Sequence, residues 1–125
     1  MNERLLLDSN VLVDYLRGRA EALDYFAGLK DTPAISAVTV AELYAGVREG
    51  KERELLDGLV PEIDVFAVTV EIAMLGGLFR RQYLKSHRLD VADAIIAATA
   101  DREKVKLVTL NRKHFPMFND LITPY

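Results

Sequence analysis

The sequence has no cysteine and only two histidines among its 125 residues. The absence of cysteine excludes disulfide bonds and thiolate zinc sites, and it fits a reducing cytoplasm, where we expect the protein to act. With so few nitrogen ligands available, a metal site in this chain would be built mainly from oxygen. Oxygen ligands suit Mg²⁺ or Mn²⁺ better than Zn²⁺.

An excess of positive charge and a long apolar run are also missing. The formal net charge is −3, which argues against a protein that binds nucleic acid through bulk electrostatics alone. It does not exclude an enzyme that acts on nucleic acid, because clustered carboxylates that hold metal ions also make the balance acidic. No apolar stretch approaches the length of a membrane span, and the first residues lack the pattern of a signal peptide. We therefore expect no membrane association.

The signatures of several other enzyme classes are missing. The chain has no Walker phosphate loop and no Gly-rich dinucleotide turn, and neither His87 nor His114 lies in a nucleophile motif. A phosphoacceptor domain of receiver or phosphatase type could use Asp8. We discount it because Asn10 stands where an Asp-x-Asp phosphatase needs its second carboxylate, and no lysine follows the last predicted strand in a suitable turn.

The sequence predicts one α/β domain over residues 1–125. Half of the residues are apolar and 28% are charged, as in globular proteins. Apolar strand patterns alternate with helical patterns from end to end, which favours a parallel sheet. We expect strands at 4–7, 34–36, 63–68 and 106–109, a short edge strand at 121–122, a helical turn at 111–115, and helices at 10–16, 19–29, from 36 or 39 to about 50, 51–59, 69–86 and 91–104.

Helical periodicity also predicts which side chains face inward. The glycine pair at 76–77 costs helix stability, for which close packing of a neighbouring element is one reason. Four aromatic residues at apolar positions are expected in the core or in a groove for a partner helix: Tyr15, Tyr25, Tyr44 and Phe79. The predicted inward faces further include Leu23, Leu55 and Leu78.

Four acidic residues follow strands or begin helices. Asp8 comes directly after the leucine run 5–7, which is apolar on both faces like a central strand. Glu42 lies early in the helix after the second strand, and Asp90 and Asp93 begin the helix that leads into the fourth. Because helix starts that follow parallel strands lie at one sheet edge, we expect all four side chains to approach one cleft.

Each acid also has a local explanation. Asp8 or Ser9 is a suitable cap for the next helix, and Thr39 and Glu42 match a capping box. Asp90 is a good N-cap, and the third helical position of the same helix suits an acid because of the helix dipole. The position of Asp8 by itself leaves the two interpretations evenly balanced.

The surroundings of Glu42 and Asp93 favour a functional role. Both are flanked by apolar residues, and burying a carboxylate without a partner is costly. A divalent cation would be a natural partner. Several carboxylates converging on one or two such ions suggest hydrolysis of a phosphodiester, because the ions activate water and neutralise developing charge.

Basic residues flank the start of the helix at 91. Arg80, Arg81 and Arg88 precede it, and Arg112 follows the last predicted strand. Such a strip would guide a phosphate backbone to an acidic metal cleft. The alternative is a solvated helix face.

With these residues in view, the chain resembles PIN-domain proteins, specifically the VapC-type toxin ribonucleases of bacterial and archaeal toxin–antitoxin pairs. Four segments carry this resemblance; in order and spacing they cover nearly the whole chain, and together they are quite specific to the family. The matching segments are LDSNVL at 7–12, SAVTVAEL at 36–43 with Gly46 after it, ADAIIAATA at 92–100, and VTLN at 108–111 with HF at 114–115.

The resemblance implies a three-layer α/β/α sandwich with a small, mainly parallel sheet. It also implies an endoribonuclease dependent on Mg²⁺ or Mn²⁺, which forms a homodimer and is inhibited by a small antitoxin protein. Asp8, Glu42 and Asp93 match the metal-binding carboxylates, and Asn111 matches a polar residue that lines the site. RNA would be the substrate, although no target sequence can be read from the chain.

One position departs from the family pattern. His114 stands where members often have a further acid, so one metal ion and two remain alternatives, with Asp90 able to supply part of the charge. His114 either packs beside its neighbour Phe115 or contacts a phosphate or metal. Ser9 and Thr109 either support the carboxylates by hydrogen bonds or cap the local backbone. The departure also leaves open a catalytically weak PIN-like module that binds RNA or a protein.

Overall fold

The computed structural model describes residues 4–125. The expectation that the first residues are not a signal peptide concerns in part residues 1–3, which lie outside the described residues. No helix within the described range is long and apolar enough to cross a membrane. Two short 3₁₀ turns cover Val60–Glu62 and Arg112–His114. The other elements are β1 (Leu5–Leu7), α1 (Ser9–Leu16), α2 (Ala20–Ala27), β2 (Ala34–Ser36), α3 (Ala37–Gly46), α4 (Lys51–Leu59), β3 (Asp64–Phe66), α5 (Val70–His87), α6 (Val91–Glu103) and β4 (Lys106–Val108).

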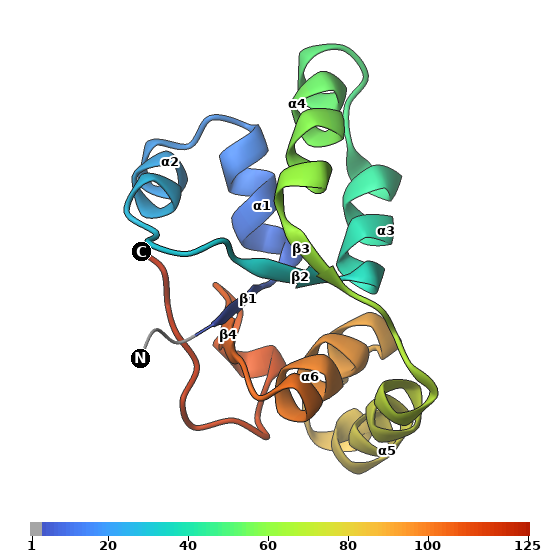
Figure 1. Cartoon of the computed structure of the whole chain (residues 1–125). Helices are drawn as coiled ribbons and strands as arrows, with labels where there is room; N and C mark the ends of the chain where they lie inside the picture. Colours follow the sequence, from blue (N-terminus) through green and yellow to red (C-terminus); the bar gives the residue numbers. More distant parts are fainter. Residues whose placement is uncertain (1–3) are drawn as a thin grey trace.

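The strands form a four-stranded parallel sheet in the order β3-β2-β1-β4. Helices α1 to α4 cover one face, and α5 and α6 lie on the other (Figure 1). The predicted α/β fold with three layers is therefore confirmed. Ile122 adds a single parallel bridge to Val108 at the edge, where a short strand is predicted.

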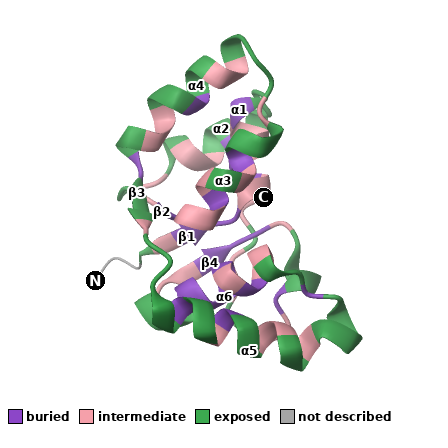
Figure 2. Ribbon diagram, turned by 90° about the vertical axis from the view of Figure 1, so that its right-hand side faces the viewer, coloured by how far each residue is buried: buried purple, intermediate pink, exposed green. Residues whose placement is uncertain are grey.

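Alternate strand residues supply the two cores. Leu7 and Ile35 face the α1–α3–α4 side, and Leu6 and Ala34 face α6. Because successive strand residues point to opposite faces, an uninterrupted apolar run can be buried on both sides. Figure 2 shows buried residues on α6 and on strands other than β3, while most of β3 and much of α5 are exposed. The leucine run 5–7 is thus the central strand that its composition predicts.

Helix α3 differs from its prediction at its C-terminal end. It ends at Gly46, and Val47 is already extended, with φ −69° and ψ 140°. Gly50, predicted as the end of this helix, instead precedes α4 with a φ of 98°. A residue with a side chain rarely adopts this angle. The glycine therefore marks the start of α4 and not the end of α3.

Four side chains that were predicted to face inward are exposed instead. Leu23, Leu55 and Leu78 are 42%, 44% and 49% exposed, and Tyr44 is 36% exposed. Of the glycine pair, Gly76 does pack closely, since a Cβ there would lie 3.2 Å from Cγ1 of Ile95 on α6. Helical periodicity identified amphipathic faces but not which of them the tertiary structure covers.

Candidate active site

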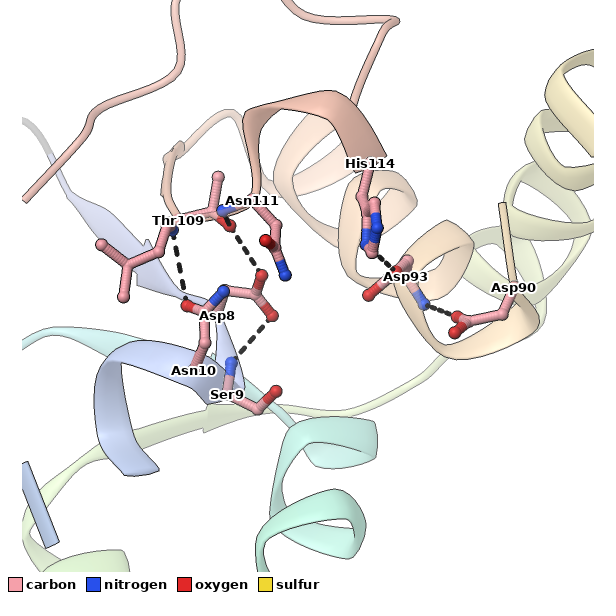
Figure 3. Close-up of polar contacts among 9 residues, drawn as sticks. Asp8, Ser9, Asn10, Asp90, Asp93, Thr109, Asn111 and His114 are labelled. Carbon is pink, nitrogen blue, oxygen red and sulfur yellow. Dashed lines mark hydrogen bonds and ion pairs between the residues drawn. The ribbon is translucent and has the colours of Figure 1, made fainter. Parts of the chain in front are cut away.

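Asp8 lies at the carboxyl end of β1 and is 3% exposed. Its Oδ1 accepts a hydrogen bond from the Ser9 backbone N–H at 2.8 Å, and its Oδ2 accepts one from the Thr109 hydroxyl at 2.8 Å (Figure 3). Burial raises the pKa of Asp8, while these two hydrogen bonds act in the opposite direction. Asp8 is therefore both the N-cap of α1 and a fixed, buried carboxylate.

The segment after β4 holds Asp8 in place. The Thr109 side-chain oxygen also accepts a hydrogen bond from the Asn111 backbone N–H at 3.0 Å, which orients its own proton towards Asp8. The Asn111 side chain points into the space between Asp8 and Asp93 (Figure 3). Both roles considered for Thr109 are thus present: a hydrogen bond to a carboxylate, across 101 residues of sequence, and one to the local backbone.

Asn10 has a structural role that its sequence position did not reveal. Its Oδ1 accepts a hydrogen bond from the Leu110 backbone N–H at 3.5 Å, joining the start of α1 to the segment after β4. The only signal in the sequence was its place directly after Asp8 and Ser9.

Glu42 has no local hydrogen-bonding role. The predicted capping box with Thr39 is wrong, because α3 already begins at Ala37 and Ser36 caps it by accepting from the Val38 N–H at 3.1 Å. Glu42 is therefore a mid-helix residue, and its Oε1 is buried without a hydrogen-bond partner among the described residues.

The pKa of Glu42 is raised to about 7. Burial is the largest cause, followed by the negative charges of Asp8, Asp93 and Asp90. The neighbouring Ser9 side chain partly counteracts the rise, which agrees with the supporting role predicted for Ser9. The ionised form of a carboxyl group that is half-buried among other acids is unfavourable unless a positive charge neutralises it.

Asp90 and Asp93 occupy the first turn of α6. Asp90 is its N-cap, and its Oδ1 accepts from the Asp93 N–H at 2.8 Å, as its local explanation predicts. Asp93 has a pKa raised to about 6, first by burial and then by the charges of Asp90 and Asp8, whereas His114 lowers it.

His114 extends towards Asp93, with its Nδ1 3.0 Å from Oδ2 of that carboxylate. The interpretation in which it only packs beside Phe115 is therefore wrong. Where the family pattern often has a further acid, this chain has an imidazole that faces an existing acid. The site accordingly contains one anionic group fewer.

The mutual pKa effects show that the four acids predicted to converge do form one electrostatic cluster. Among residues 4–125, however, no three acidic or histidine side chains are already gathered around one point as a ready metal cage. The available ligand atoms are carboxylate oxygens, which suit Mg²⁺ or Mn²⁺. The buried Oε1 of Glu42, which has no partner among the described residues, is free to bind such an ion. Side chains would have to close around the ion.

The predicted basic strip divides into two parts. Arg112 donates hydrogen bonds to the Leu121 carbonyl at 3.1 Å and the Thr123 hydroxyl at 3.0 Å, so it fastens the C-terminal segment. Arg80 and Arg81 lie on α5, and Arg88 directly follows that helix as its C-cap. These three arginines have no hydrogen bond or ion pair with any described residue.

The sequence matches the PIN domain family over residues 5–118. It is 43% identical over 124 residues to a protein named Ribonuclease VapC10 from Mycobacterium tuberculosis, covering 97% of this chain and 92% of that one. It is 41% identical to Ribonuclease VapC19 from the same organism, covering 96% and 98%. A structure described as a toxin–antitoxin complex from Klebsiella pneumoniae superposes with a TM-score of 0.82 at 28% identity, covering 97% and 98%.

Proposed function

Because this chain belongs to the PIN domain family, we propose that it is an endoribonuclease that requires Mg²⁺ or Mn²⁺ and acts as the toxin of a toxin–antitoxin pair. The relatives named as ribonucleases match it over nearly their whole length. The observation that carries the chemistry is the buried Oε1 of Glu42, which has no hydrogen-bond partner among the described residues and lies inside a cluster of acids. We propose the cytoplasm, where RNA is available, as its place of action.

Asp8, Glu42 and Asp93 would hold the cation, with Asp90 adding negative charge nearby. When bound, the ion would neutralise charge on the scissile phosphate and make water a better nucleophile. Thr109 and Ser9 fix the Asp8 carboxylate, so little rearrangement is needed on that side of the site.

Two further groups can handle protons or orientation. Glu42, whose carboxyl group has a pKa of about 7 without the ion, has an alternative role to that of third metal ligand: it is then the base that orients the attacking water and accepts its proton. His114 holds the Asp93 carboxylate from the solvent side. Because no additional acid stands at position 114, we favour one tightly bound ion over two.

The test is cleavage of RNA with Mg²⁺ or Mn²⁺, with and without chelator. We expect Asp8→Asn and Asp93→Asn to lose activity by about 100-fold or more, since each removes a metal ligand. Asp24→Asn, which changes an exposed carboxylate on α2, is the matched control and should retain full activity.

Activity that persists in both site variants, or that survives the chelator, would show that the metal-site assignment is wrong. The second candidate is the catalytically weak module, which the missing acid at His114 favours. It would bind metal in calorimetry and yet cleave none of the RNAs tested.

We further propose that the antitoxin docks in a groove between α1, α2 and α4. The groove has a volume of about 420 Å³. Three basic residues and one acid stand at its rim, so it favours an amphipathic helix that carries acidic side chains. The apolar lining is Tyr15, Leu16, Leu23 and Leu55, and the charged lining is Arg17, Arg48, Lys51 and Glu52.

The other aromatic residues considered for such a groove lie elsewhere. Tyr25 packs against Tyr125 with ring centroids 6.4 Å apart, and Phe79 packs against the core on the α6 side. Tyr44 donates a hydrogen bond to Asp57 at 2.6 Å. Only Tyr15 of the four lines the groove.

A homodimer is also part of the proposal. Val70, Met74 and Leu78 recur at four-residue spacing on α5 and are 73%, 65% and 49% exposed. They form one apolar stripe, which we name the α5 stripe. A second copy of the chain packed on the α5 stripe would remove this surface from water.

A further inference from the structure

The arginines of the described chain fall into two groups. Six have a hydrogen bond or ion pair within the protein: Arg4, Arg17, Arg19, Arg48, Arg53 and Arg112. The remaining four have neither with any residue in 4–125: Arg80, Arg81, Arg88 and Arg102. Three of these four belong to the last turns of α5 or directly follow it. Three of the four arginines without an internal counter-ion are thus close together in sequence, at the end of α5.

Arg80 differs from its neighbours in burial. Arg81 and Arg88 are exposed, whereas Arg80 is half-buried and its Nε is fully buried without an acceptor. A buried N–H of a charged group is costly unless an acceptor reaches it. The partly buried stem also restricts the side chain, so less conformational entropy is lost when an anion binds.

The register of α5 and α6 places Arg80 near the acid cluster. Gly76 meets α6 at Ala94 and Ile95, and only residues 88–90 connect the two helices. The helices must therefore run back along each other, as Figure 1 shows. One turn beyond Gly76, Arg80 lies alongside the first turn of α6.

That first turn carries Asp90 and Asp93, and neither forms an ion pair with Arg80. The positive charge of Arg80 is therefore not neutralised by an ion pair with either of these acids. A guanidinium offers a planar fork of donors that matches the oxygens of a phosphate. A phosphate supplied from outside the protein would give this guanidinium its acceptor.

We propose that Arg80 anchors a backbone phosphate of the RNA beside the acid cluster, an assignment that rests on the proposed ribonuclease function. Arg112 is a poorer candidate for this anchor, because its Nη1 already donates to the C-terminal segment. Arg81 and Arg88, which are exposed, contribute only long-range attraction.

Binding of a fluorescently labelled single-stranded RNA, measured by anisotropy in chelator, tests this assignment without cleavage. We expect Arg80→Gln to weaken binding about 10-fold and to reduce the slope of log K against log salt by about 1. Arg102→Gln is the matched control. It removes the same charge from an equally unpartnered arginine at the far end of α6, about 16 Å along the helix, and should change binding less than about 2-fold.

Arg80→Lys keeps the charge and the stem but loses the fork, and we expect an intermediate affinity. Thermal unfolding serves as the folding control. Arg80→Gln should unfold at close to the wild-type temperature, because it breaks no hydrogen bond or ion pair with a described residue. If Arg80→Gln is unstable, Arg80→Lys is used instead: weaker RNA binding than wild type supports the assignment, and wild-type affinity contradicts it.

Equal affinities of Arg80→Gln and Arg102→Gln would overturn the assignment. So would an effect of Arg80→Gln on molar mass or on antitoxin capture alone, because Arg80 would then serve a protein interface. Failure of the proposed function is distinguished separately, since wild type would then cleave no RNA when Mg²⁺ or Mn²⁺ is present.

Discussion

At the scale of single residues, Glu42 shows most clearly how burial and charge combine. Its carboxyl group has a pKa of about 7 in the folded protein against an ordinary 4.5, and Asp93 has about 6 against 3.8. The unfolded chain therefore releases these protons at lower pH than the folded protein does. Stability from this source is complete below the ordinary pKa values and is lost as pH rises through the folded ones.

In chelator, we expect the free energy of unfolding to fall as pH rises from about 4.5 to 7. Glu42 alone contributes a slope of at most about 1.4 kcal/mol per pH unit. Glu42→Gln should flatten this dependence, as measured by urea unfolding at several pH values. Addition of Mg²⁺ or Mn²⁺ should restore stability at pH 7, because the cation binds the ionised form.

The control for this prediction is Glu54→Gln, which changes an exposed acid of α4 and should leave the pH dependence as in wild type. Parallel curves for wild type and Glu42→Gln between pH 5 and 7 would mean that Glu42 is not held among the other acids.

At the scale of elements, the α5–α6 contact positions the acids of α6. Gly76 allows the close approach, since a Cβ there would lie 3.2 Å from Ile95 Cγ1, 3.3 Å from Ile95 Cα and 3.4 Å from the Ala94 carbonyl oxygen. Two of these atoms are backbone and cannot move aside without shifting α6. Gly77 has no atom within 4 Å of the same position.

We therefore expect Gly77→Ala to stabilise the protein by about 0.5–1 kcal/mol, which is the gain in helix propensity. Gly76→Ala gains the same propensity but is opposed by overpacking of about 1–3 kcal/mol. In urea unfolding, Gly77→Ala should be more stable than Gly76→Ala by about 1–3 kcal/mol. If the two variants are equally stable, α5 and α6 do not pack as closely as described.

At the scale of the whole molecule, two exposed apolar surfaces lie on opposite sides of the sheet. The α5 stripe belongs to the layer of α5 and α6, and the groove of α1, α2 and α4 belongs to the other layer. Because the sheet separates them, a dimer partner and an antitoxin helix can bind at the same time. Neither surface contains the acid cluster.

Met74→Glu, on the α5 stripe, should convert a dimer into a monomer in light scattering, because it introduces a charge into an apolar contact. Leu55→Glu, in the groove, is the matched variant and should leave the molar mass unchanged. With the antitoxin, the outcomes should be reversed, and Leu55→Glu should weaken capture by about 10-fold or more. A wild type that is monomeric at all concentrations would remove the dimer from the proposal.

The sequence alone determined the alternation of strands and helices, the doubly covered leucine strand and the identity of the clustered acids. These features are local, because strand and helix periodicities and the residue that follows a strand are read within a few positions. The same locality explains the errors. Two capping signals lie at Ser36 and Thr39, and only the folded chain shows that Ser36, the last residue of β2, is the N-cap of α3.

Only the tertiary structure decided the strand order, the contact of His114 with Asp93 and the hydrogen bond from Thr109 to Asp8, which joins residues 101 positions apart. It also separated Arg112, which holds the C-terminal segment, from Arg80, which has no internal partner. The physical reason is the same in each case. Whether a polar group finds a partner depends on which distant segments fold against it, and no local pattern records that.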